Sequence, residues 1–189
     1  MVLHQLKEES VIVSKSNNIY AIPLALFDDD QRLENFNCQT PILDEFLHTQ
    51  ARKSDNDGLT ATTIIVNEEN DVIGYFTLNI GTQEIQMKDT HSCYPIPFVN
   101  LAYLAVDYRH CCLGYGRRIV KYIYKKLVPT FLLLGFSYVF VQSLSDSVGF
   151  YKKLGFEMDS KNEKTFEEQG TKLEKYEMLI KVSKIISMV

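Results

Sequence analysis

The sequence predicts an α/β protein (α+β in its mixed sheet), with one mixed central β-sheet flanked by helices. Residues 99–142 read as strand, helix, strand, the pattern of a parallel βαβ unit with a right-handed crossover. Two β-rich runs before it are joined by a short polar turn, which predicts an antiparallel hairpin. The chain has 189 residues, no internal repeat and no linker-like stretch. We therefore expect one domain over residues 1–189, with its core at about 20–181.

The first half of the chain contains a strand, a helix and the hairpin. Residues 20–27 are apolar enough for a strand, which three aspartates end. Thr40 and Pro41 then fit the N-cap and first position of a helix, and apolar residues recur at helical spacing until the polar run 54–58. The hairpin strands are expected at 59–66 and 72–80.

The second half carries the βαβ unit. A proline-containing loop is expected at 94–97, followed by a nearly all-apolar strand at 99–106, typical of a buried central strand. A turn with glycines leads into a helix over about 114–128. The remaining predicted elements are a strand, a short helix ended by Gly155 and a final strand, at 136–142, 146–154 and 173–180.

Composition excludes several classes of protein. Apolar residues make up 46% and charged residues 23%, a globular balance, and no apolar run reaches the roughly 18 residues of a membrane span. The N-terminus carries acids early, unlike a secretory signal, so a cytoplasmic location and no membrane association are expected. The four cysteines form no CxxC pair and the four histidines have no ligand spacing, so we expect neither a disulfide framework nor a metal site.

Charge is unevenly distributed. The formal net charge is −4, which argues against a surface that coats nucleic acid generally. Between residues 104 and 126, however, Asp107 is the one acid among six bases: Arg109, Arg117, Arg118, Lys121, Lys125 and Lys126. This stretch is consistent with a solvated helix face or with a site for an anionic ligand.

The segment LAVDYRHCCLGYGRRIV, residues 104–120, favours the second of these interpretations. Gly114 and Gly116 lie where a buried strand leads into a helix whose first turn holds Arg117 and Arg118. Unpaired N–H groups at a helix N-terminus suit a phosphate, and glycines let it approach the backbone closely. A simple tight turn is the alternative, since the segment is neither a Walker A loop nor a full dinucleotide fingerprint.

Two motifs resemble the signatures of the GNAT N-acetyltransferases. Cys111, Gly114 and Gly116 occupy the positions of the pattern Q/R-x-x-G-x-G/A, and SLSDSVGFYKKLGFE (143–157) is similar to the second signature of the family. The resemblance covers residues 36–157. FNCQTPILDEFL, VIGYFTLN and IPFVNLAYLAVD look like the branch of bacterial GNAT toxins of toxin–antitoxin pairs, which acetylate the amino group of aminoacyl-tRNA.

This chain departs from the family pattern at three positions. Cys111 stands where the family has Gln or Arg, and Cys112 where Gly is common. Tyr103 stands where the toxins commonly carry Arg, directly before LAVD. The first two departures bear on cofactor affinity, and the third on recognition of tRNA.

The resemblance implies acetyl-CoA as the co-substrate and direct attack by an amine. Backbone around Leu104, Ala105 and Val106 would face the acetyl-pantetheine arm, and Tyr151 would protonate the leaving thiolate, although packing beside Phe150 is its alternative role. The pyrophosphate would lie on a loop made of Cys111, Cys112, Leu113, Gly114, Tyr115, Gly116 and Arg117. Cys111 or Cys112 as a nucleophile, and His110 or Asp107 as a base, are weaker alternatives.

The predicted function is therefore an N-acetyltransferase that uses acetyl-CoA to acetylate a primary amine, with aminoacyl-tRNA as the most specific candidate. The alternatives are a small-molecule amine, a protein N-terminus, or a non-catalytic acetyl-CoA-binding module. Glu68, Asp71 and Glu84 are scattered in the sequence, which argues against an acidic pocket for a cationic amine. The toxin-like framework also implies an antitoxin protein and a homodimer as candidate partners.

Overall fold

The computed structural model describes residues 11–12, 18–86, 93–168 and 171–189. Contacts divide the chain into two compact units: residues up to Asn79 with Ala102–Tyr122, and Ile80–Leu101 with Ile123–Val189. The strands are β1 (Val11–Ile12), β2 (Ile19–Pro23), β3 (Ala61–Val66), β4 (Val72–Gln86), β5 (Cys93–Val106), β6 (Tyr138–Leu144), β7 (Glu157–Glu168) and β8 (Thr171–Lys181). The helices are α2 (Asp30–Glu34), α3 (Pro41–Glu45), α4 (Ala51–Asn56), α5 (Tyr115–Leu134), α6 (Val148–Lys153) and α7 (Val182–Ile186), with shorter turns at Leu24–Leu26, Phe46–Gln50, Tyr108–His110 and Ser145–Ser147. Among the described residues, no helix has the length and apolar character needed to cross a membrane.

The first unit is built on an antiparallel meander of β1, β2, β3 and the first part of β4. Ile22 pairs with Ile64, and Ile64 pairs in turn with Tyr75, so the predicted hairpin is confirmed. The end of β5 joins β4 through the Asp107 amide, which donates to the carbonyl of Ile73 at 2.8 Å. The last residues of β5 are thereby held beside the start of β4.

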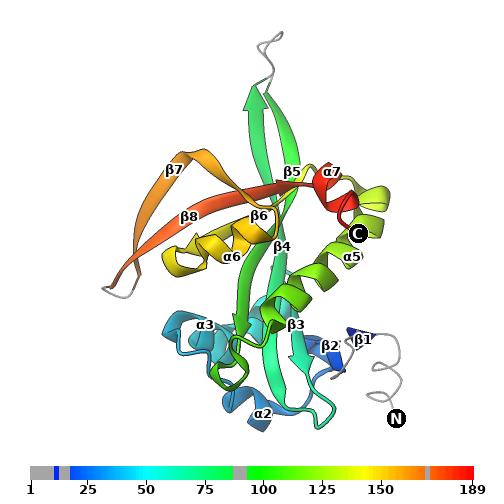
Figure 1. The fold of residues 1–189 in the computed structure, drawn as a ribbon, viewed down its shortest axis with the longest axis vertical. Helices are drawn as coiled ribbons and strands as arrows, with labels where there is room; N and C mark the ends of the chain where they lie inside the picture. Colours follow the sequence, from blue (N-terminus) through cyan, green and yellow to red (C-terminus); the bar gives the residue numbers. More distant parts are fainter. Residues whose placement is uncertain (1–10, 13–17, 87–92, 169–170) are drawn as a thin grey trace. The chain divides into compact units, whose positions relative to one another are not determined.

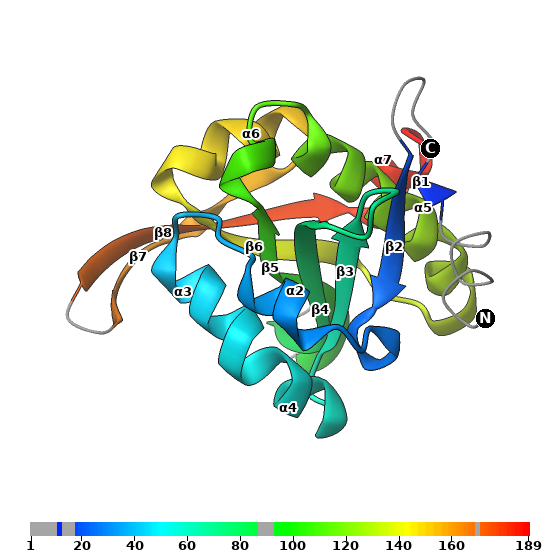
Figure 2. The ribbon, with the colours of Figure 1, turned by 90° about the horizontal axis from the view of Figure 1, so that it is seen from below.

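Helices α2, α3 and α4 lie over the strands of this unit, where their apolar side chains form the core (Figure 2). Tyr75 is fully buried there, and its hydroxyl donates to the carbonyl of Leu43 at 2.7 Å. The ring of Phe46 stacks on that of Tyr103, with centroids 3.7 Å apart. The helical segment from Pro41 is continuous through the π-turn Phe46–Gln50 to Asn56. The helix before β3 thus closes this face of the sheet, as the sequence predicts.

The first turns of α5 cover the alternate side chains of β4. The ring of Phe76 lies 6.3 Å from that of Tyr122. On the same strand is Gly74, where a Cβ atom would come 2.6 Å from the carbonyl oxygen of Ala105 and 3.4 Å from the side chain of Ile119. Because backbone cannot yield as a flexible side chain can, Gly74 is required for the close approach of β4 to β5.

The second unit contains the parallel pair of the predicted βαβ unit. β5 pairs with β6 in parallel at Val99–Val139 and Asn100–Phe140, while β6 pairs with β8, and β8 with β7, in antiparallel fashion. The sheet is therefore mixed, as predicted. In Figure 1, β7 and β8 form a long hairpin, and α6 lies beside β6.

Several predicted boundaries are wrong because proline was given too much weight. The expected loop at 94–97 is part of β5, since the carbonyl of Pro97 still accepts a hydrogen bond from the amide of Ser137 at 2.9 Å. Helix α5 continues through Pro129 to Leu134 rather than ending near 128. Gly135, with φ of 69°, ends it instead.

Other differences lie at the ends of the chain and in the capping of helices. The first strand stops at Pro23, and Leu24–Leu26 form a 3₁₀ turn. The sequence did not predict α2, whose N-cap Asp29 accepts from the Arg32 amide at 3.1 Å, nor β7 and α7. Thr40 does precede the helix, but its side chain makes no capping bond.

Candidate active site

The last residues of β5 present backbone that β6 does not pair. Pairing with β6 ends at Asn100, whereas β5 continues to Val106, so residues 101–106 have no registered β6 partner in the described chain. The side chain of Ala105 is buried in the core under the helices, and Leu104 and Val106 are half-buried. Backbone N–H and C=O groups along such an edge can bond an amide-containing chain lying beside it. The roles predicted for Leu104, Ala105 and Val106 remain a prediction.

Residues 107–117 follow β5 and include the predicted anion site, so we call them the anion-holding loop. Gly114 has φ of 81°, and a Cβ atom there would meet nothing within 4 Å. Helix α5 begins at the next residue, and its first helical bond after the loop runs from the Arg118 amide to the carbonyl of Gly114. Within the described residues, the six consecutive amides of residues 112–117 donate no hydrogen bond. These N–H groups, together with the positive end of a 20-residue helix, suit a phosphate.

Cys111 and Cys112 differ in what their backbone contributes. The amide of Cys111 is occupied, because it donates to the carbonyl of Tyr108 at 3.3 Å. Cys112 is exposed and holds φ of 64°, a conformation that favours glycine. Burial, and then the nearby Cys112 and Asp107, raises the pKa of the Cys111 thiol. The raised pKa disfavours Cys111 as a nucleophile, since the thiolate is the reactive form.

Arg109 is exposed, but its guanidinium is paired with a buried carboxylate. Its guanidinium binds the carboxylate of Asp107 through two hydrogen bonds, Nε to Oδ1 at 2.7 Å and Nη2 to Oδ2 at 2.8 Å. The Asp107 side chain is fully buried. Burial alone would raise the pKa of Asp107, but hydrogen bonds from Arg109 and from the Asn37 amide lower it overall. Asp107 thus ends the strand, as predicted, while a carboxylate so fully bonded is poorly suited to take a proton.

The remaining bases of the stretch lie along α5. Arg117, Lys121 and Lys125 are exposed and spaced four residues apart, which places them on one face of the helix. None of the three makes an ion pair within the described part of the chain. The guanidinium of Arg118 instead lies 5.1 Å from the ring centroid of Tyr115. We refer to Arg117, Lys121 and Lys125 as the basic stripe.

Tyr151 belongs to α6, in the second unit. Its ring is 6% exposed and meets Phe150 and Phe156 edge-on, with centroids 5.0 and 5.3 Å away. Its hydroxyl makes no hydrogen bond within the described residues, and its oxygen is not among the buried polar atoms that lack a partner. Burial raises its pKa, so the phenol stays protonated at neutral pH. The predicted catalytic role thus remains open alongside a packing role for the ring.

The end of α6 is fixed by a second tyrosine that the sequence analysis did not single out. Tyr124 of α5 donates its hydroxyl to the carbonyl of Leu154 at 2.9 Å, and both residues are buried. The amides of Leu154 and Phe156 both bond to the carbonyl of Tyr151. This network holds the backbone of Tyr151 in place, whereas the Tyr151 hydroxyl is left available.

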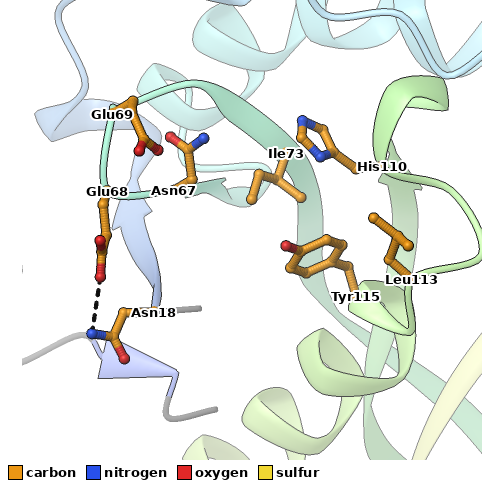
Figure 3. A pocket seen from close by; sticks show the side chains of 8 residues that line it. All are labelled: Asn18, Asn67, Glu68, Glu69, Ile73, His110, Leu113 and Tyr115. Atoms are coloured by element: carbon orange, nitrogen blue, oxygen red, sulfur yellow. Dashed lines mark hydrogen bonds between the residues drawn. The ribbon is translucent and has the colours of Figure 1, made fainter. Parts of the chain in front are cut away.

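A pocket of about 250 Å³ opens beside the anion-holding loop. Figure 3 shows His110, Leu113 and Tyr115 on one side of it and the turn that carries Glu68 and Glu69 on the other. Glu68 also accepts a hydrogen bond from Asn18 at 3.1 Å. Of the three acids that the sequence analysis described as scattered, Glu68 lines this pocket, together with its neighbour Glu69. Among the described residues, no group of three or more His, Cys, Asp or Glu side chains could hold a metal ion.

The described chain thus combines a mixed sheet, a parallel strand pair joined through a helix, and a glycine with positive φ between strand and helix. Residues 24–156 match the model of the acetyltransferase (GNAT) family, and the chain belongs to that family. It is thus an acyl-CoA-dependent N-acetyltransferase. A search of curated protein sequences returns no significant match.

Solved structures with the same fold include several toxins. A bacterial toxin superposes with a TM-score of 0.75 at 17% identity, covering 90% of this chain and 94% of the other. AtaT in complex with acetyl-methionyl-tRNAfMet gives a TM-score of 0.71 at 22% identity, with 90% and 98% covered. A tyrosine-to-phenylalanine mutant of KacT gives 0.69 at 17% identity, with 90% and 99% covered. At these identities the likeness establishes the fold.

Proposed function

We propose that the protein transfers the acetyl group of acetyl-CoA to a primary amine, and that the amine belongs to aminoacyl-tRNA. The observation that carries the first part is the row of six amides at residues 112–117, at the start of α5, which donate no hydrogen bond to any residue that the structure describes. Acetyl-CoA offers a pyrophosphate that needs such donors, so the loop fits this co-substrate. AtaT structures with acetyl-CoA support the same assignment by analogy of fold.

The reaction requires two things of the protein: it must hold the amine beside the thioester, and it must supply one acid that protonates the leaving sulfur. The amine nitrogen attacks the thioester carbonyl carbon, a C–N bond forms, and the C–S bond breaks with its electron pair going to sulfur. Tyr151 donates its proton to the departing sulfur, and the phenol regains one from the nitrogen, which has become acidic. A phenol kept protonated by burial is in the right state for this role.

The acceptor is inferred from the basic stripe. Arg117, Lys121 and Lys125 face solvent on one side of α5 in a protein whose formal net charge is −4. Arg117 lies next to the amides assigned to pyrophosphate, which leaves Lys121 and Lys125 for a second polyanion. A nucleic acid backbone fits two exposed cations one helical turn apart better than a small amine does.

The direct test compares acceptors. The protein is incubated with acetyl-CoA labelled in its acetyl group, together with charged total tRNA, small polyamines or peptides with free N-termini. Label on charged tRNA, lost when the aminoacyl bond is hydrolysed before incubation, is the expected result. Label only on amines or peptides would overturn the tRNA assignment and leave the acetyltransferase assignment standing.

The pocket beside the loop supports a second candidate, acetylation of a small cationic amine. Glu68 and Glu69 give it negative charge, and His110 and Tyr115 line its other side. Glu68→Gln combined with Glu69→Gln should then raise the KM for a polyamine severalfold, by removing the charges that attract it. The KM for charged tRNA should not rise in this variant, so the two candidates are separable.

A further inference from the structure

The Asp107 carboxylate has every oxygen engaged. Oδ1 accepts from the Arg109 amide at 2.9 Å and from Arg109 Nε at 2.7 Å. Oδ2 accepts from Arg109 Nη2 at 2.8 Å and from the Asn37 amide at 3.1 Å. The side chain of Asp107 has no exposed surface. A buried carboxylate bonded this fully is part of the architecture rather than a reagent.

These bonds join two segments that are distant in sequence. The connector of residues 35–37 leads from α2 toward α3, and residues 107–110 form the start of the anion-holding loop. Arg109 Nη2 also donates to the Asn35 carbonyl at 3.3 Å, and the Tyr108 amide donates to the Asn37 carbonyl at 2.8 Å. The loop is therefore tied on one side to the connector by side chains and backbone together.

Residues 107–111 also make backbone hydrogen bonds to β4 and to one another. The Asp107 amide bonds to the carbonyl of Ile73, and the carbonyl of Asp107 accepts from the His110 amide at 2.9 Å. The Cys111 amide closes the following turn onto Tyr108. The unbonded amides begin immediately after this fixed turn, at Cys112. The direction in which they point depends on the turn being held.

We infer that Asp107 and Arg109 form a positioning pair that orients the amides of residues 112–117 toward the phosphates of acetyl-CoA. Neither side chain touches the reacting atoms. The guanidinium acts through its planar fork, which holds both carboxylate oxygens and the Asn35 carbonyl at once. The inference rests on the proposed function for its ligand, and it gives the guanidinium of Arg109 a partner within the protein.

The variant Arg109→Lys distinguishes a positioning role of Arg109 from the role of a simple surface cation. Arg109→Lys keeps the positive charge and the exposed half of the side chain, but a single ammonium cannot reproduce the fork. Arg52→Lys is the matched control, because Arg52 likewise bonds a carboxylate, that of Asp30, and the backbone carbonyls of Leu24 and Phe27. Arg52 lies outside the anion-holding loop.

The experiment measures acetyl-CoA binding by calorimetry and amide hydrogen exchange across residues 108–117 on the full-length protein. We expect Arg109→Lys to weaken acetyl-CoA binding roughly tenfold and to speed exchange in the loop, while Arg52→Lys changes neither. At saturating acetyl-CoA, kcat should stay within about twofold of wild type, so that the loss appears in KM. A general loss of stability would not produce that split.

Two outcomes would overturn the inference. The first is Arg109→Lys matching wild type in both acetyl-CoA affinity and loop exchange. The second is Arg109→Ala lowering the salt dependence of tRNA binding by about one charge while Arg109→Lys binds acetyl-CoA normally, which would make Arg109 a phosphate contact. If the wild-type protein does not bind acetyl-CoA, the proposed function is wrong. In that case the positioning pair is still tested, because unchanged amide hydrogen exchange across residues 108–117 in Arg109→Lys would contradict it.

Discussion

Cys112 and Gly114 lie two residues apart and both hold their backbone in the left-handed region, with φ of 64° and 81°. Only Gly114 is suited to that conformation by its lack of a Cβ atom. The loop that presents the unbonded amides therefore has one favourable and one strained residue. The strain at Cys112 identifies the position at which the sequence departs from the common glycine of the family.

Replacing Cys112 should reveal this strain. Cys112→Gly is expected to stabilise the protein by up to about 1 kcal/mol, because relief of about 1–2 kcal/mol of left-handed strain exceeds the added chain entropy of glycine. Cys112→Val should destabilise it by about 1–2 kcal/mol, since a β-branched residue tolerates positive φ poorly. Thermal unfolding should separate the two variants by several degrees.

The adjacent cysteine provides the control for this comparison. Cys111 is also exposed but has φ of −62° and ψ of 154°, an extended conformation that any residue adopts. Cys111→Val should therefore leave the melting temperature almost unchanged. Equal effects of valine at both positions would mean that the backbone at Cys112 relaxes in solution.

Gly114→Glu should abolish acetyl-CoA binding. The substitution places an anion among the amides assigned to pyrophosphate, where the open space around Gly114 would otherwise admit the ligand. Gly58→Glu is the matched control, since Gly58 has φ of 71° and also meets nothing within 4 Å. Both variants should lose similar stability from backbone strain. Calorimetry showing equal acetyl-CoA affinity in the two would remove the basis for placing phosphates on this loop.

Tyr151→Phe should lower kcat about 10²- to 10⁴-fold with acetyl-CoA affinity nearly kept, as expected for loss of a general acid. Its stability should hardly change, because the hydroxyl has no hydrogen-bond partner within the described residues. Turnover on the true acceptor within threefold of wild type would assign Tyr151 to packing alone.

Tyr124→Phe gives the opposite pattern and serves as the control. It removes a 2.9 Å hydrogen bond and leaves the buried carbonyl of Leu154 unpaired, which should cost about 1–3 kcal/mol. Its kcat should remain within a fewfold of wild type. Chemical denaturation and steady-state kinetics on both variants would thus distinguish a catalytic hydroxyl from a structural one.

Sequence patterns predicted the elements that depend on local periodicity. The hairpin followed from two β-rich runs joined by a polar turn, and the βαβ unit from an all-apolar strand that leads through a glycine-containing turn into a helix; both are present. The structure differs from the prediction at two prolines: the carbonyl of Pro97 takes part in β-type hydrogen bonding, and α5 continues through Pro129 although proline lacks the N–H of a helical hydrogen bond. The real stop signal of that helix was Gly135.

The candidate anion site was predicted from residues that are close together in the chain. Gly114 and Gly116 at a strand-to-helix junction were enough to indicate an anion site, and the structure leaves amides unbonded there. The bond between Asp107 and the amide of Asn37, by contrast, joins residues 70 positions apart. No spacing rule reveals such a contact, so Arg109 was grouped with the exposed bases.

The Asp107 carboxylate should make stability depend on acidity. Its pKa is lowered in the folded protein, so the stabilisation it gives is present above the ordinary value of about 3.9 and is lost as pH falls through the folded value. Wild type should therefore lose more unfolding free energy than Asp107→Asn does between pH 7 and about 3. Urea unfolding at the two pH values checks this, and parallel losses would show that the carboxylate is not specially stabilised.

The basic stripe should appear in the salt dependence of tRNA binding. Each phosphate contact contributes about 0.7–0.9 to the slope of log affinity against log salt, so replacing both Lys121 and Lys125 with Gln should reduce that slope by roughly 1.4–1.8. Lys53→Gln, on the exposed side of α4, removes one charge outside the stripe and should leave the slope unchanged. Acetyl-CoA affinity should change little in either variant, because the amides of residues 112–117 remain. A slope that is the same in all three proteins would place tRNA elsewhere on the surface, while a matching loss of acetyl-CoA affinity would assign the two lysines to the co-substrate.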